Sequence, residues 1–227
     1  MYIFLERSYP RRFAALAIKV KIANLIFLTQ KFLLHQLNEG DNGESLETSL
    51  SRYDLTETVV HVFHSAVAIF HAPSDVSGIG GMRREHIRAT PSWRKGQPRY
   101  DTVFVETDST KSGMRGMHIA RVFLFFSFTF NFTEYPCALI QWFEAVDDTP
   151  DDETGMWVVE PEILDNGAPF LAVIHVDCIL RAAHLIPVYG EDFVQERHEI
   201  NPSTTLDNFT TFYVNKYVDS HANEIAF

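Results

Sequence analysis

The sequence predicts an α+β protein in which a small β-barrel-like domain is flanked by an N-terminal helix and a C-terminal helix. Three observations lead to this prediction. Residues 120–143 form a tract of aromatic and β-branched residues, short apolar segments recur from residue 101 to residue 189, and residues 11–39 contain neither Pro nor Gly. Several short strands separated by turn residues are typical of a small barrel or sandwich.

The aromatic tract predicts a β-hairpin at the centre of the domain. Residues 120–132 and 135–143 are rich in Phe, Val, Ile and Leu, and residues 131–134 between them are turn-like. Aromatic and β-branched residues favour strands. The tract contains no grouping of side chains that performs chemistry, so we interpret it as core.

Further segments complete the predicted domain. The expected strands are 101–106, 118–132, 135–143, 155–160, 170–175 and 185–189. Residues 177–183 predict a short helical turn, and residues 210–221 predict the closing helix, with Asp207 as a cap. Residues 57–71 fit either a strand pair or a helix.

Residues 11–38 predict one long helix, with Pro10 before its first turn and Gly40 after its end. Apolar residues cover most of its surface, which is typical of a helix inside a larger protein. The expected organisation is a helical remnant with a polar linker (1–56), a connecting segment with a basic loop (57–99) and the barrel-like domain with its C-terminal helix (100–227).

The charge is unevenly divided. Residues 1–99 carry 13 Lys and Arg against 9 Asp and Glu, a net +4, whereas residues 100–227 carry 6 against 21, a net −15. A surface with that excess of carboxylates repels phosphate, so the second half is not expected to grip nucleic acid over its whole face.

The two cysteines, Cys137 and Cys178, lie in apolar runs and predict free thiols. Two cysteines form neither a disulfide framework nor a Cys₄ zinc site, which favours a reducing compartment, nuclear or cytoplasmic, over secretion. The apolar segment 22–28 is far shorter than the ~20 residues that a bilayer requires, so no membrane insertion is expected.

Histidines suggest a weak metal candidate. His61 and His64 are three residues apart, and His71 and Asp75 follow. On a helix this spacing places two imidazoles on one face, although a zinc site needs three or four converging ligands. Ordinary core or surface histidines are the simpler interpretation, and we expect no metal and no cofactor. The acidic run 147–153 lacks the calcium-loop pattern and is interpreted as a solvated turn.

The basic segment is the best candidate for function. Residues 72–99 predict an irregular loop, and the basic side chains within it surround one tryptophan: Arg83, Arg84, Arg88, Trp93, Arg94, Lys95 and Arg99. Arginine binds phosphate, and an aromatic ring stacks on bases, so this combination suits nucleic acid. The alternative is that these cations pair with the acidic second half of the same chain. Residues 78–81 carry three glycines without a phosphate-loop pattern and predict turns with positive φ.

Longer motifs add a family resemblance. They are Ser65-Ala-Val-Ala68, Ala72-Pro-Ser-Asp-Val-Ser-Gly-Ile-Gly-Gly-Met82, Arg83-Arg-Glu-His-Ile-Arg-Ala-Thr-Pro-Ser-Trp93, Tyr135-Pro-Cys-Ala-Leu139, Thr154-Gly-Met-Trp-Val-Val-Glu-Pro161 and Phe212-Tyr-Val-Asn-Lys-Tyr217. Over about 160 residues this succession resembles the C-terminal region of Plavaka/KDZ-type transposase-like proteins of mushroom-forming fungi. The resemblance implies that a catalytic core would lie upstream and that this chain is a truncated or degenerate copy, so no catalytic residue is carried over.

A second likeness concerns the order of strands. A hairpin ending in Gln141-Trp-Phe143, an acidic loop and the segments 156–162 and 184–190 are similar to the succession in BAH modules, which are β-rich chromatin-interaction domains. Together the two likenesses imply a non-catalytic accessory region with DNA or a chromatin protein as partner. The alternative is a protein–protein interaction domain without a role in nucleic-acid binding.

Overall fold

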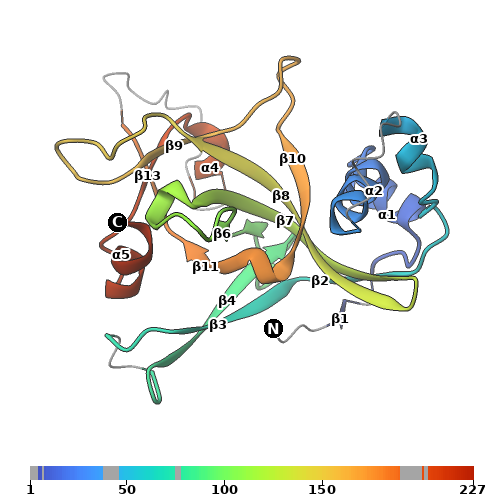
Figure 1. The fold of residues 1–227 in the computed structure, drawn as a ribbon, viewed down its shortest axis with the longest axis horizontal. Helices are drawn as coiled ribbons and strands as arrows, with labels where there is room; N and C mark the ends of the chain where they lie inside the picture. The colour runs from blue at the N-terminus through green and yellow to red at the C-terminus, as the bar shows by residue number, and fades with distance from the viewer. Residues whose placement is uncertain (1–4, 7, 38–45, 75–77, 190–200, 202–203) are drawn as a thin grey trace.

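A computed structural model describes residues 5–6, 8–37, 46–74, 78–189, 201 and 204–227. Its centre is the hairpin of β7 (Met117–Phe130) and β8 (Thr133–Ala145), which belongs to an antiparallel sheet of ten strands in the described part of the chain (Figure 1). The predicted hairpin is therefore confirmed. Asn131 and Phe132 form its two-residue turn with φ of 48° and 64°, as a type I′ turn requires.

One half of the hairpin is part of a nearly closed barrel. The first residues of β7 pair with β6 (Thr102–Glu106), and β6 pairs with β11 (Ile179–Ala183). On the other side, β8 pairs with β9 (Val158–Pro161), then β13 (Phe212–Val214) and β12 (Leu185–Pro187). Only His184 separates β11 from β12, so this segment connects the two edges of the sheet.

The barrel interior contains large apolar side chains from all around the sheet. Phe104, Ile119, Phe143 and Phe212 are each at most 1% exposed, and Trp157 packs with them. The expected α+β class with a small barrel-like sheet therefore describes the molecule. A β-bulge between Val122 and Leu124 lies where β7 passes from the barrel to the second half of the sheet.

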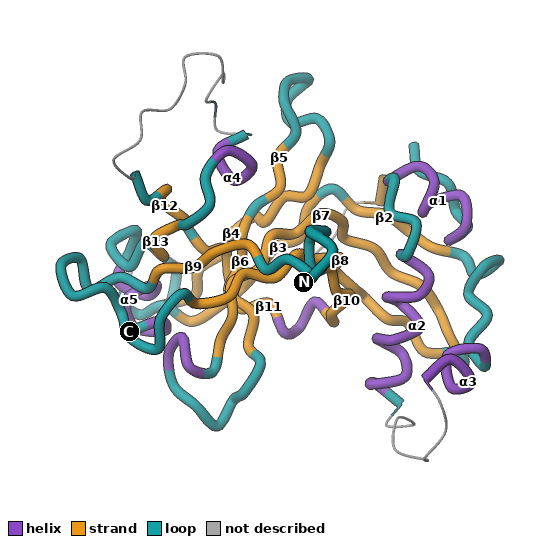
Figure 2. Tube along the Cα trace, turned by 90° about the horizontal axis from the view of Figure 1, so that it is seen from above, coloured by secondary structure: helices purple, strands orange, loops and turns teal. Residues whose placement is uncertain are grey.

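The second half of the sheet is covered by helices on one face. Here β7 and β8 pair with β2 (Val60–Phe63) and β10 (Leu171–His175), and β1 (Leu5–Glu6) extends the edge. Against it pack α1 (Phe13–Val20) and α2 (Leu25–Gln36), with α3 (Leu46–Ser51) beside α2 (Figure 2).

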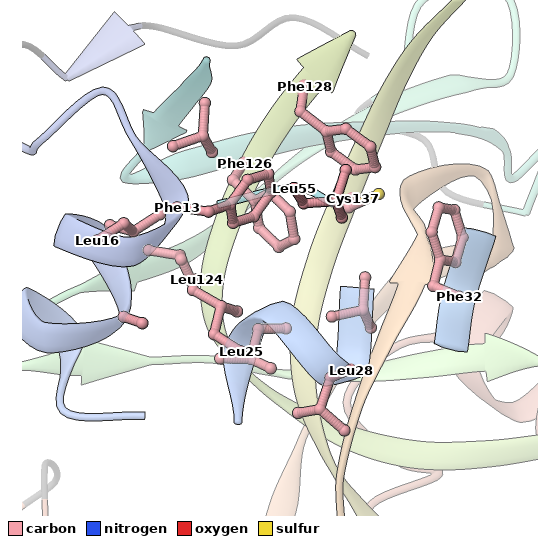
Figure 3. Close-up of a cluster of buried hydrophobic side chains, with 14 of the residues drawn as sticks. Phe13, Leu16, Leu25, Leu28, Phe32, Leu55, Leu124, Phe126, Phe128 and Cys137 are labelled. Carbon is pink, nitrogen blue, oxygen red and sulfur yellow. The ribbon is translucent and has the colours of Figure 1, made fainter. Parts of the chain in front are cut away.

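The interface between helices and sheet is aromatic. Phe13 makes edge-to-face contacts with Phe126 at 5.8 Å and Phe128 at 5.5 Å between ring centroids (Figure 3). Phe32 approaches Tyr135 in the same way at 6.1 Å. Residues of the predicted segment 1–56 thus share a core with residues of the predicted domain 100–227.

The prediction of one helix over residues 11–38 is wrong, because the chain turns at Lys21. This residue has a φ of 60°, and the N–H of Ile22 donates to the carbonyl of Ala17 across the turn. Such a C-terminal motif normally has glycine at the left-handed position, and here lysine occupies it. The break lets both helices lay apolar residues on one sheet, which the poorly amphipathic single helix would not do.

A separate small sheet replaces the predicted irregular loop. β3 (Ser65–His71) pairs with β4 (Met82–Thr90), and β4 pairs with β5 (Arg99–Tyr100). Of the two alternatives for residues 57–71, strands are confirmed and the helix is not, although β2 and β3 belong to different sheets and do not pair with each other. Gly80 and Gly81 have φ of 63° and 76°, as the predicted turn requires. The distal part of β3 and β4 forms an arm that extends beyond the barrel (Figure 1).

Two local predictions near the C-terminus are corrected. Of the predicted turn at 177–183, only residues 177 and 178 are helical, as part of a 3-10 turn (Val176–Cys178), and β11 follows at once. The closing helix does not span 210–221, because β13 inserts between β9 and β12. Instead α5 (Ser220–Ala226) is capped by the Asp219 carboxylate, which accepts from the Ala222 N–H at 2.8 Å, and Asp207 lies within α4 (Thr205–Asn208).

No helix in the described ranges combines the length and apolar character needed to span a membrane.

Candidate functional site

The predicted basic residues fall into two groups. Arg83 and Arg84 lie on the distal arm of β4. Arg88 lies near the end of β4, Arg99 begins β5, and residues 91–98 connect the two strands. The register pairs Thr90 with Arg99. The expected irregular loop therefore includes a hairpin, and cations gather around the tryptophan at its turn and at the adjoining ends of β4 and β5.

Three guanidinium groups surround the indole of Trp93. The Cζ atoms of Arg88, Arg94 and Arg99 lie 4.2, 5.4 and 5.7 Å from the ring centroid. All three distances are within the range of a cation–π interaction. With Lys95 in the same turn, we call Arg88, Trp93, Arg94, Lys95 and Arg99 the Trp93 cluster.

The turn holds the cluster in a defined shape. The Trp93 N–H donates to the Gln97 carbonyl at 2.9 Å, and the Gly96 N–H donates to the Trp93 carbonyl at 2.8 Å. Arg94 and Lys95 occupy the two central positions with φ of 51° and 65°. Non-glycine residues at such φ values cost free energy and are found at functional sites more often than elsewhere. Figure 2 shows the loop beside β5 standing out between α1 and α4.

The cations of the cluster are only partly neutralised. Arg99 donates from Nε to Asp101 at 2.7 Å, and the second Asp101 oxygen accepts from the Arg88 backbone N–H at 2.9 Å. Partial burial and the charges of Arg99 and Arg94 lower the pKa of Arg88, against the opposing effect of Asp101. A guanidinium whose neighbours are also cations gains from an added anion.

The alternative prediction is that these cations pair with the acidic second half of the chain, in which residues 147–153 are the densest acidic run. Among the described residues, no ion pair joins Arg88, Arg94 or Arg99 to residues 147–153. Within that run, Asp151 caps its own turn by accepting from the N–H and hydroxyl of Thr154 at 2.8 and 2.7 Å. The acidic run is thus a turn. The ion pair of the cluster joins Arg99 to Asp101, a residue of the acidic second half, so the alternative is met for this one cation and not through residues 147–153.

A groove of about 450 Å³ opens next to the cluster. Trp93, Gln97, Arg99, Tyr100 and Arg121 contribute to its walls. Arg121 is 6% exposed, and its Nη1 donates to Asp207 at 2.5 Å, while its buried Nε has no partner in the described part of the chain. Aromatic rings and guanidinium groups therefore line one continuous surface.

The histidines do not converge. His61 lies within β2, and His64 lies just beyond its end, so the helical spacing that would join them does not exist. His64 faces Glu6 at 3.5 Å and Tyr9, whereas His71 ends β3. No group of three or more His, Cys, Asp or Glu side chains that would hold a metal occurs in the ranges described, and Asp75 lies outside them.

A buried arginine that the sequence did not reveal organises another region. Arg181, 1% exposed, donates from both terminal nitrogens to Asp219 at 2.7 Å and from Nη2 to Glu85 at 3.5 Å. Its Cζ lies 4.8 Å from the Phe70 ring, which stacks on His221 at 4.6 Å. The Arg181 hydrogen bonds hold the pKa of Asp219 at about 2.

This arrangement, which we call the Arg181 network, joins the arm, β11 and the start of α5. The only available signal was a lone arginine between apolar residues at positions 179–183, which a strand would bury. Cys137 is also fully buried, and burial raises the pKa of its thiol, while Cys178 is half-buried; both are free.

Comparison of this chain with protein-family models, with curated proteins and with solved structures finds no match.

Proposed function

We propose that this chain is a non-catalytic accessory region of a transposon-derived protein that associates with nucleic acid, as DNA or chromatin, through the Trp93 cluster. The observation that carries the proposal is the convergence of three guanidinium groups on one indole at 4.2–5.7 Å. The proposal also takes in the transposase-like and BAH-like resemblances of the sequence, and a nuclear location would follow from it.

The chemistry of the cluster suits a nucleic-acid strand. Guanidinium groups bind phosphate oxygens in bidentate fashion, and Lys95 adds a further cation in the same turn. Trp93 and Tyr100 face the adjacent groove and supply surfaces on which an unpaired base stacks. Of the cluster's cations, Arg99 has a carboxylate partner, Asp101, at 2.7 Å.

The charge of the whole chain limits how such binding occurs. With a net charge of −11, the molecule repels a polyanion at long range, so contact must be made where cations are concentrated. The projecting turn meets this requirement because it gathers several cations around one indole. We therefore expect a small footprint, weak affinity and a steep dependence on salt.

The test is a salt titration of binding between the full chain and a fluorescein-labelled single-stranded DNA, followed by anisotropy. The double variant Arg94→Gln, Lys95→Gln removes two cations from the turn. Glutamine is, like arginine and lysine, a non-glycine residue with an unbranched side chain, so the two positions of positive φ keep the same kind of residue. About 0.7 counterions are released per phosphate contact, so two lost contacts make the slope of log K against log salt concentration shallower by about 1.4. When the salt is lowered from 1 M to 0.1 M, the affinity of the variant therefore rises about 25-fold less than that of the wild type.

The matched control is Arg11→Gln with Lys19→Gln, which removes the same charge from exposed residues at the helical end. Equal losses in both double variants would show that only net charge matters and would refute the cluster. Trp93→Ala is expected to weaken binding by about 5- to 150-fold, the value of one stacked base, while Trp93→Phe retains most of the affinity. Absence of any binding at low salt would also refute the proposal.

A further inference from the structure

The outer edge of β3 has backbone groups that pair with nothing in the described part of the chain. The His64 carbonyl accepts from the N–H of Ala89 in β4 at 2.9 Å, and the Ala72 N–H donates to the carbonyl of Gly81, just before β4, at 2.7 Å. The uninterrupted register places the even-numbered residues between His64 and Ala72 in the same orientation. Val67, Ile69 and His71 therefore direct their N–H and C=O groups away from β4. This leaves an edge that an added strand would complete.

This edge lacks the features that protect exposed strands. Natural edge strands carry lysine, proline, inward-pointing charges or bulges that prevent pairing with other chains. The seven residues of β3, Ser-Ala-Val-Ala-Ile-Phe-His, contain no proline, lysine, arginine or carboxylate, and its ladder with β4 has no register shift. Ile69 and His71 are exposed and Val67 is 5% exposed, so the accessible part of this regular edge lies towards the end of the arm, where an added strand would find no protective residue.

A groove of about 370 Å³ runs along the same edge. Four consecutive β3 residues, 67–70, line it, and neighbouring residues on a strand point to opposite faces, so the groove follows the edge rather than one face. Its opposite wall includes Val176, Leu180 and Ile225, which are apolar. A strand lying there would place every second side chain against these residues.

The rim of the groove opposite β3 is acidic, whereas on the β4 side Arg83 and Arg84 lie across from Phe70 and Ile69. Asp177 lines the groove with a side chain that is 81% exposed. Glu106 lies in the same region as Asp177, because both carboxylates act on the thiol of Cys178. Partial burial and the charges of Asp177 and Glu106 raise the pKa of this thiol. Glu224 is exposed on α5, one turn after His221, which also lines the groove. A bound segment gains from positive charge on the side chains that face this rim.

We propose that the β3 edge binds an extended peptide of a partner protein by strand addition, and that this peptide alternates apolar residues with lysine or arginine. Main-chain hydrogen bonds would supply affinity, and the groove would select the side chains. A second copy of this chain fits less well, because two-fold pairing along β3 brings two acidic rims together. This surface is separate from the Trp93 cluster and does not depend on nucleic-acid binding.

The experiment measures binding of the full chain to a fluorescein-labelled peptide of alternating valine and lysine by anisotropy. Two matched probes have glutamate in place of lysine, or the same side chains with N-methylated backbone amides. Ile69→Pro removes one outward N–H without touching the ladder to β4, and Ile69→Thr keeps it. Asp177→Lys reverses the charge of the rim.

We expect N-methylation and Ile69→Pro to weaken binding about 10-fold or more, and Ile69→Thr to change it less than about 3-fold. Asp177→Lys should weaken the lysine peptide and strengthen the glutamate peptide. Amide exchange in the wild-type chain gives a readout that does not require a folded variant: Val67, Ile69 and His71 should become protected by the peptide, while Ala66 and Ala68 should not change. Equal binding of all three probes, unchanged exchange at residues 67, 69 and 71, or self-association abolished by Ile69→Pro would each overturn the proposal.

Discussion

Replacing Arg181 with methionine tests whether the Arg181 network holds the arm and the C-terminal helix on the barrel. The Arg181 side chain is 2% exposed, while the Asp219 and Glu85 side chains that it contacts are 17% and 24% exposed. Removing one partner of a buried ion pair leaves the other charge without compensation and costs about 3–5 kcal/mol. Because both carboxylates retain some contact with water, we expect a loss near the lower end, about 3 kcal/mol.

Asp219→Asn separates the charge from the helix cap. Asparagine still accepts from the Ala222 N–H, as Asp219 does at 2.8 Å, and it is as good a cap as aspartate. Only the ionic contribution is lost, so we expect about 1–3 kcal/mol. In the double variant Arg181→Met, Asp219→Asn, the loss of unfolding free energy should be smaller than the sum of the two single losses, with a coupling energy of about 2 kcal/mol.

The assay is equilibrium unfolding in urea at pH 7, followed by tryptophan fluorescence and circular dichroism. Arg115→Met is the control, because this exposed arginine lies outside the network and its loss should cost less than about 0.5 kcal/mol. The reasoning is refuted if Arg181→Met costs less than about 1 kcal/mol, or if the losses from Arg181→Met and Asp219→Asn simply add.

Further measurements follow from single residues. The pKa of Asp219 is held at about 2, below its ordinary 3.8, so its contribution of about 2 kcal/mol is complete above about pH 5 and is lost as the pH falls through 2; urea titrations of Asp219→Asn should lack this dependence. Phe132 is fully exposed at a φ of 64°, so Phe132→Gly, which creates an Asn-Gly turn, should raise thermal stability by about 0.5–1 kcal/mol, whereas a gain from Phe132→Ala would contradict this explanation. The buried thiol of Cys137 should react with a maleimide at pH 8 no faster than the protein unfolds, and rapid labelling of Cys178→Ser would disprove its burial.

The sequence predicts the structure of a segment best when the local composition alone favours the structure that the segment adopts. The β7–β8 hairpin combines strand-forming residues with a short turn, and neither depends on distant contacts. β13 could not be predicted, because Phe212-Tyr-Val214 is too short to show a period and becomes a strand only through its ladders with β9 and β12. Lys21 breaks a helix without any glycine or proline signal, so its conformation is set by tertiary packing.

The candidate site shows the same division. The basic composition around Trp93 is visible in the sequence, but the separation of Arg83 and Arg84 from the cluster is not. It follows from the pairing of β4 with β3, which replaces the expected loop and leaves only residues 91–98 as a turn. Arg181 was missed for a different reason. Its partners Glu85 and Asp219 are 96 and 38 residues away in sequence, and no local pattern announces such a contact.

The place of β13 in the barrel has a consequence for synthesis on the ribosome. β9 ends at Pro161 and β13 begins at Phe212, so roughly 50 residues must be added before the missing strand exists. At about 5–20 residues per second this takes about 3–10 s. During that interval Phe104, Ile119 and Phe143 lack their partner Phe212, and the nascent chain presents an apolar interior that chaperones recognise.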